Sequence, residues 1–161
     1  MELGKAILGK DTVMLIRVWK MANRILVDTG FWYAVFDKKD CHRDQAAAML
    51  DNYFDKAAYE IVVPFPTMYE LLRTKFVKNK AALDEIKQMF QSGQIIKIHD
   101  DKYRSAALDM TLNERKRNIS LVDNIIRLML EDKTLMPKGL ITFNIGDFQD
   151  ICVKNGIEIL C

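Results

Sequence analysis

The chain has 161 residues, of which 50% are apolar and 29% charged, proportions typical of one globular domain. Its 7 glycines and 3 prolines exclude collagen-like and low-complexity classes. No apolar run approaches the roughly 20 residues that a membrane-spanning helix needs. The three cysteines lack the paired spacing of a disulfide framework or a zinc site, so we expect reduced thiols in a cytoplasmic protein.

The net charge is small, because 24 Lys and Arg stand against 22 Asp and Glu. Residues 1–20 hold the whole excess of +2, so binding of a polyanion would need a local basic patch. These residues also differ in pattern from the rest of the chain, and Met21 stands directly before the first strong strand. We therefore interpret 1–20 as an N-terminal extension and 21–161 as the folded domain.

Strands and helices alternate along this domain. The apolar run 25–27 predicts a buried strand followed by a turn at Asp28–Gly30, and residues 42–57 have helical spacing. Then come a strand over 61–63, helices over 67–79 and 81–91, a strand over 95–98, helices over 103–116 and 121–132, and strands over 140–143 and 157–160. This alternation predicts a mainly parallel sheet covered on both faces, a three-layer α/β/α sandwich.

Acidic residues fall where the carboxyl ends of these strands are expected. Asp28 follows the first strand, Glu70 lies one helical turn after the second, and Asp123 opens the helix before the fourth. Asn144 and Asp147 follow the fourth strand. Ligands of parallel sheets bind at this edge, where converging carboxylates repel one another unless a cation neutralises them. Carboxylate oxygens without His or Cys suit Mg²⁺ or Mn²⁺ and phosphodiester hydrolysis.

Each acid also has an ordinary structural interpretation. Asp28 could cap the next helix, and Thr67 with Glu70, like Ser120 with Asp123, has capping-box spacing. Asp147 could be a loop residue. Capping explains each acid singly, but it does not explain why all of them fall at one edge of the sheet.

Five segments resemble PIN-domain ribonucleases, most closely the toxin of VapBC-type toxin–antitoxin pairs, and they occur in the order and spacing of that family. They are ILVDT at 25–29, DCHRDQA at 40–46, VPFPTMYE at 63–70, SLVD at 120–123 and TFNIGDF at 142–148. The resemblance extends over about residues 24–161. It implies a PIN-like fold and a Mg²⁺- or Mn²⁺-dependent endoribonuclease, with an RNA substrate, a cognate antitoxin that blocks the acidic groove, and a homodimer.

The resemblance also implies the catalytic and metal-binding set, namely Asp28, Glu70, Asp123 and Asp147. The fourth position departs from the commonest family pattern, because many relatives have Asp where this chain has Asn144. We favour Asp147 as the fourth acid, with Asn144 helping through hydrogen bonds. Thr29 and Thr142 are expected to support the site with their hydroxyls.

Two basic runs are candidate RNA contacts, the first with Arg73 and Lys75 and the second with Arg115, Lys116 and Arg117. A basic run is more often a solvated helix face than an RNA contact. The ring of His42 could serve as a general base, but a structural role at a helix entrance is favoured. Phe31, Trp32 and Tyr33 are interpreted as packing residues in preference to a base-stacking platform, although one of them could line the groove.

Two other functions remain as alternatives. A catalytically inactive PIN-fold module that binds RNA or a partner is kept open by Asn144 in the acidic set. A phosphotransfer domain of similar topology needs a second acid two residues after the nucleophilic Asp, and this chain has Gly30 there.

Overall fold

The computed structural model describes residues 23–161 apart from 55, 57, 94 and 114–117, so the N-terminal extension and the basic run 115–117 lie outside the described residues. At the centre is a five-stranded sheet in the order β3-β2-β1-β4-β5, in which every neighbouring pair is parallel. The strands are β1 (Arg24–Val27), β2 (Glu60–Pro64), β3 (Ile95–Ile98), β4 (Gly139–Ile141) and β5 (Glu158–Leu160). The predicted strands and the parallel sheet are thus confirmed.

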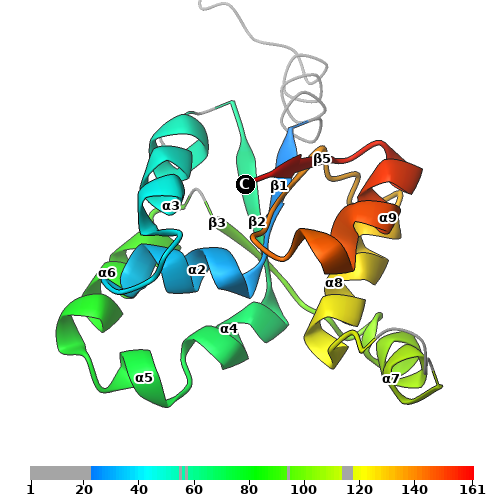
Figure 1. Ribbon diagram of the computed structural model, residues 1–161, viewed down its shortest axis with the longest axis horizontal. Coiled ribbons are helices and arrows are strands. Elements are labelled where there is room, and N and C mark those ends of the chain that lie inside the picture. Colours follow the sequence, from blue (N-terminus) through cyan, green and yellow to red (C-terminus); the bar gives the residue numbers. More distant parts are fainter. Residues whose placement is uncertain (1–22, 55, 57, 94, 114–117) are drawn as a thin grey trace, which may run out of the picture.

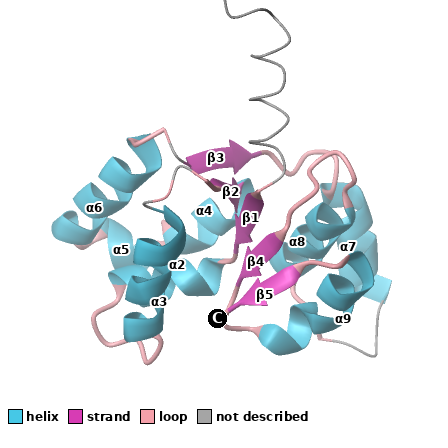
Figure 2. Ribbon diagram, turned by 90° about the horizontal axis from the view of Figure 1, so that it is seen from above, coloured by secondary structure: helices cyan, strands magenta, loops and turns pink. Residues whose placement is uncertain are grey.

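Helices cover both faces of the sheet (Figures 1 and 2). One side carries α2 (Thr29–Phe36), α3 (Arg43–Met49) with its π-helical continuation η1 (Leu50–Phe54), α4 (Phe65–Leu71), α5 (Thr74–Val77) and α6 (Lys80–Gln91). The other carries α7 (Arg104–Asn113), α8 (Leu121–Glu131) and α9 (Ile145–Asn155). The three-layer α/β/α sandwich expected from the sequence is therefore present.

The alternation of side chains along the strands builds two cores. Ile25 and Val27 of β1 pack in a cluster with Phe31 and Trp32 of α2, whereas Leu26 packs on the opposite face with Ile126 of α8. Successive strand residues point to opposite faces, so one short strand supplies both hydrophobic layers. Burial of these apolar faces fixes the sheet between its helices.

Two helices stand where none was predicted. The turn predicted after β1 is instead the start of α2, because the Asp28 side chain accepts a hydrogen bond from the Thr29 N–H at 2.6 Å and caps the helix. The segment after β4 forms α9, which ends at Gly156 in the left-handed conformation (φ 64°) that favours glycine.

The helix predicted over 67–79 starts earlier and is broken. It begins at Phe65, since Pro66 is tolerated in a first turn, where N–H groups have no helical partner. The capping role predicted for Thr67 is therefore wrong: its hydroxyl is buried and makes no hydrogen bond among the described residues. The chain leaves the helix after Leu71 and resumes it at Thr74 as α5.

The strand order reverses at β1. The chain runs from β1 to β2 and β3 on one side, and β4 and β5 are added on the other. A crevice forms at such a switch point, outside the carboxyl ends of the strands. In the described part of the chain no helix is long and apolar enough to cross a membrane.

Candidate active site

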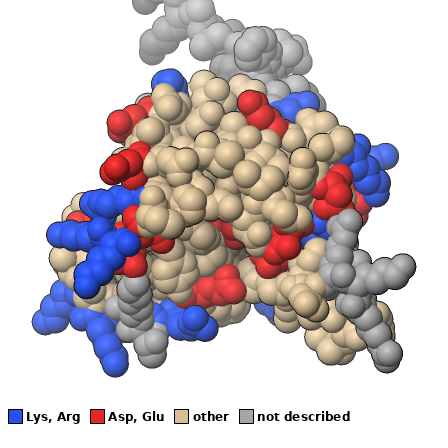
Figure 3. Space-filling view, in the orientation of Figure 1, with Lys and Arg blue, Asp and Glu red and all other residues tan. Residues whose placement is uncertain are grey.

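A pocket of about 480 Å³ lies at this switch point. The residues that line it are Asp28, Thr29, Gly30, Tyr33, Glu70, Arg73, Ser120, Asp123 and Asn144. Acidic side chains surround a hollow in the lower middle of the face in Figure 3, and basic ones gather at its lower left. Residues from four separate parts of the sequence thus meet at one edge of the sheet.

Asp28 is the most buried acid of the pocket, with 6% of its surface exposed. Its backbone N–H extends the β1–β4 pairing by donating to Ile141, and its second carboxylate oxygen accepts from the Thr142 hydroxyl at 2.8 Å. Burial raises the pKa of Asp28 to about 6, and the charges of Asp123 and Glu70 also raise it. The hydrogen bonds from the Thr142 hydroxyl and the Thr29 N–H lower the pKa of Asp28, because they stabilise its charged form.

Glu70 is held from α2. The Thr29 hydroxyl donates to its Oε2 at 2.5 Å, and the Tyr33 hydroxyl donates to its backbone carbonyl at 2.9 Å. These two bonds fix α4 against α2, so the carboxylate of Glu70 faces the same pocket as Asp28. The sequence predicts the Thr29 support; for Tyr33 it favours packing over a place in the groove, whereas Tyr33 lines the pocket.

Asp123 lies in the first turn of α8, where the predicted capping box is confirmed. Its N–H donates to the Ser120 hydroxyl oxygen at 3.1 Å, and that hydroxyl donates to the Asp123 carboxylate at 2.6 Å. Burial raises the pKa of Asp123, the charge of Asp147 raises it further, and the Ser120 hydrogen bond lowers it. Ser120 is therefore both a helix cap and a lining residue of the pocket.

Asn144 and Asp147 differ in their relation to the pocket. Asn144 lines it, while Asp147 is not among the lining residues in the described part of the chain. The Asn144 amide donates to Asp147 Oδ2 at 2.5 Å, and its backbone N–H donates to Thr142 Oγ1 at 3.0 Å. The start of α9 is tied to α8 by Arg127, which donates to the Asp147 carbonyl and, in two parallel bonds, to Asp150.

The remaining sequence candidates fall in different places. Arg73 lines the pocket, whereas the Lys75 side chain and residues 115–117 lie outside what the structure describes. The His42 ring stacks on Phe143 with ring centroids 4.2 Å apart, and its Nδ1 lies 2.8 Å from Gln45 Oε1, as expected of a structural residue at a helix entrance. Phe31 and Trp32 are fully buried packing residues, as predicted.

The chemistry of the donor set fits a hard divalent cation. The pocket presents carboxylate, hydroxyl and amide oxygens, and the raised pKa values of Asp28 and Asp123 show the unfavourable charge that a cation would neutralise. Within the described residues, no three His, Cys, Asp or Glu side chains are grouped closely enough to hold a metal ion. Binding would therefore require the acids to draw together.

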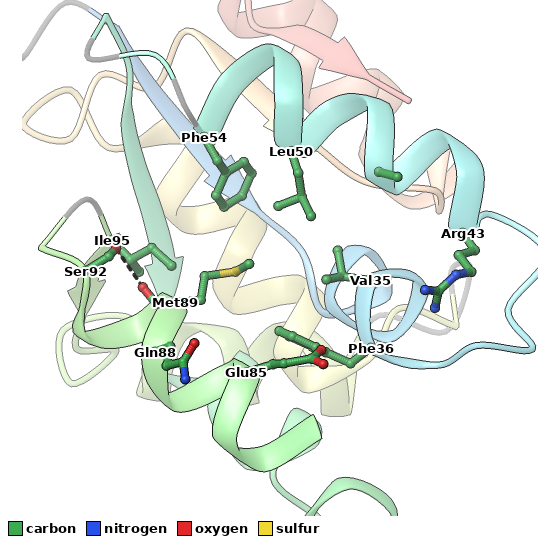
Figure 4. A pocket seen from close by; sticks show the side chains of 11 residues that line it. Val35, Phe36, Arg43, Leu50, Phe54, Glu85, Gln88, Met89, Ser92 and Ile95 are labelled. Carbon is green, nitrogen blue, oxygen red and sulfur yellow. Dashed lines mark hydrogen bonds between the residues drawn. The ribbon is translucent and has the colours of Figure 1, made fainter. Parts of the chain in front are cut away.

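A second and larger groove, of about 550 Å³, lies between α2, α3 with η1, and α6 (Figure 4). Its lining is mostly apolar, with Leu50, Phe54 and Met89 facing the opening. Glu85 is the one carboxylate among the described residues that line it. The grouped acids therefore line the pocket at the switch point and not this groove.

Comparison with solved structures gives a clear match in fold. VapC20 of Mycobacterium tuberculosis, described as a sarcin–ricin loop cleaving toxin, matches with a TM-score of 0.63 over 78% of this chain and 94% of that chain. The chain has a PIN-like fold. The sequence identity to VapC20 is 16%, so the match shows the shared PIN-like architecture and no more. No family model and no curated protein matches the chain.

Proposed function

We propose that the protein is a metal-dependent endoribonuclease that hydrolyses RNA phosphodiester bonds and acts as the toxin of a toxin–antitoxin pair. One observation carries this proposal: Asp28, Glu70 and Asp123, from separate elements, line a single pocket at the switch point of a PIN-like sheet. Helix capping accounts for the placement of Asp28 and Asp123 but not of Glu70, and it gives no reason for three carboxylates around one hollow.

In this proposal Asp28, Glu70 and Asp123 hold Mg²⁺ or Mn²⁺. Asp147, whose carboxylate accepts a hydrogen bond from the Asn144 amide, is the fourth acid of the set. A divalent cation bound there would lower the pKa of a water molecule and stabilise the leaving oxygen of the phosphodiester. The carboxylates must be charged to bind it, so the hydrogen bonds that lower the pKa of Asp28 and Asp123 favour the binding state.

The hydroxyls around the acids orient them before substrate arrives. Thr142 holds Asp28, Thr29 holds Glu70 and Ser120 holds Asp123, each by a bond of 2.8 Å or less. Hydrogen bonds of this kind orient the ligands of a metal and contribute to its affinity. Arg73 lines the same pocket, which supports its proposed role as a contact to a phosphate of the RNA.

The proposed partners follow from the resemblance and the fold. VapC20 is described as a toxin that cleaves an RNA loop, and this supports RNA as the substrate class. We propose a cognate antitoxin that blocks the acidic pocket, and a homodimer in the cytoplasm.

Cleavage of a mixed RNA pool by the purified protein with Mg²⁺ or Mn²⁺ tests the proposal. We expect cleavage that is lost with EDTA and in Asp28→Asn, and retained in Asp84→Asn, which changes an exposed acid of α6. Cleavage that survives both EDTA and Asp28→Asn would contradict the assignment of the site.

The second candidate function, an inactive RNA-binding module, is favoured by one observation. Asn144 lines the pocket where the commonest form of the family has an acid, and Asp147 is not a lining residue in the described part of the chain. An inactive module would bind RNA equally well with and without a chelator and would show no cleavage under any metal condition.

A further inference from the structure

Three aromatic rings gather at the same edge of the sheet as the acidic pocket. Phe65 is the first residue of α4, Tyr69 lies one turn later, and His99 directly follows β3. The His99 ring stacks on Phe65 with centroids 5.0 Å apart and planes 14° apart. The Tyr69 ring meets Phe65 edge to face at 5.3 Å and 76°. Phe65 therefore holds both outer rings in fixed orientations.

The strand register places this cluster beside Asp28. Leu26 pairs with Val62 and Pro64 pairs with Ile98, so Asp28, the residue after β1, lies level with Pro64 and Ile98 at the ends of β2 and β3. Phe65 follows β2, the strand next to β1, and His99 follows β3, the second strand from β1. At the usual spacing of strands these residues lie roughly 5 and 10 Å from Asp28 along the edge of the sheet. Tyr69 precedes Glu70 in α4. The ring cluster thus lies along the same sheet edge as the acidic pocket, beyond the described residues that line it.

Burial distinguishes Tyr69 from a packing residue. Its surface is 63% exposed, although Phe65 beneath it is half-buried and Leu71 in the same helix is fully buried. His99 is exposed as well. A tyrosine whose role was to pack α4 on the sheet would place its ring in the core, as Leu71 does. The rings of Tyr69 and His99 are instead exposed to solvent while each packs against Phe65.

The charges nearby favour a neutral, flat ligand. Arg104, five residues after His99, is already bonded to Asp100 at 2.7 Å and to Asp101 at 3.1 Å. A phosphate would meet these carboxylates, whereas an uncharged ring needs only an aromatic face. A nucleobase has such a face, and it is accessible only where the base is unpaired.

We propose that Tyr69, supported by Phe65 and His99, is the platform on which an unpaired RNA base next to the scissile phosphate stacks. This inference rests on the proposed nuclease function and deepens it, since it makes single-stranded or looped RNA the substrate class. Tyr69 is a positioning residue here: it holds the base while the acids act on the phosphodiester.

Binding of unstructured oligoribonucleotides by fluorescence anisotropy tests the platform. The measurements use the Asp28→Asn protein with Mg²⁺ so that RNA is bound without being cut. We expect Tyr69→Ala to weaken binding about tenfold or more and Tyr69→Phe to leave it nearly unchanged, because phenylalanine keeps the ring. Val153→Ala removes another side chain that is mostly exposed and is expected to have no effect. Melting temperatures should match in all variants, since Tyr69 contributes little buried surface.

An oligonucleotide series with one abasic nucleotide at each position in turn identifies the stacked base. At one position, removal of the base and Tyr69→Ala should together reduce the binding free energy by less than the sum of their separate effects, because both remove the same contact. Equal affinity of the Tyr69→Ala and Tyr69 proteins, or the absence of RNA binding in both, would overturn the platform. RNA binding that depends on Tyr69, without metal-dependent cleavage by the wild-type protein, would uphold the platform and contradict the nuclease.

Discussion

At the scale of single residues, Asp28 has two functions that conflict energetically. It caps α2 and receives the Thr142 hydroxyl, yet its carboxylate is buried beside Glu70 and Asp123. Burial is the larger effect and raises its pKa to about 6. The folded, metal-free protein therefore binds a proton here between about pH 4 and pH 6, where the unfolded chain has released it.

This predicts the direction in which stability changes with pH. Because the folded state holds the extra proton, the free energy of unfolding should fall as pH rises from about 4 to 6. In Asp28→Asn that contribution to the slope should be absent, and the metal-free variant should be more stable at pH 7 by on the order of 2 kcal/mol. Denaturant unfolding with EDTA at a series of pH values measures both effects. Asp84→Asn is the control, and an unchanged slope in Asp28→Asn would contradict the buried charge.

Thr142 is expected to act through Asp28. Its hydroxyl lowers the pKa of Asp28, so Thr142→Val should raise that pKa and move the acidic limb of the rate–pH profile to higher pH. Cleavage at pH 7 should fall about tenfold, as expected for loss of a hydrogen bond to a charged group. Thr142→Ser keeps the hydroxyl, so its rate–pH profile and its cleavage rate at pH 7 should match those of the wild-type protein. A uniform loss of rate with no change in pH profile, in both variants, would indicate a packing role instead.

At the scale of elements, the strands were predicted and two helices, α2 and α9, were not. The strands are short apolar runs bounded by turn residues, and this signal is local. Helix α2 has the sequence TGFWYAVF, which buries apolar residues on several sides and so lacks the one-sided pattern of an amphipathic helix. For α9 a signal was present in the spacing of Phe148, Ile151 and Cys152 and in the stop at Gly156.

The start of α8 provides a test at this scale. Ser120→Ala removes the acceptor for the Asp123 N–H and the donor to its carboxylate, so the free energy of unfolding should fall by about 1 kcal/mol. Ser105→Ala, on the exposed surface of α7, is the matched control. Equal stability of the two variants in urea unfolding would show that the cap contributes nothing.

At the scale of the whole molecule, the site depends on strand order, which sequence patterns did not predict. The acids could be named from their positions after strands and from the resemblance, but their meeting depends on β4 being added beside β1. That placement brings Thr142 to Asp28 across 114 positions of sequence. The sequence favours Asp147 as the fourth acid, but among the described residues Asn144 lines the pocket and Asp147 does not. This difference could not be predicted, because it depends on how Arg127 fixes α9 to α8.

The central claim is that the acids at this edge form a divalent cation site. Diffraction from crystals soaked in Mn²⁺, with the anomalous signal of the metal recorded, tests it most directly. We expect a peak in the switch-point pocket within coordination distance of Asp28 and at least one of Glu70 and Asp123, and no peak there in Asp28→Asn crystals. Manganese bound only elsewhere, or a pocket without a peak in the wild-type protein at millimolar Mn²⁺, would contradict the claim.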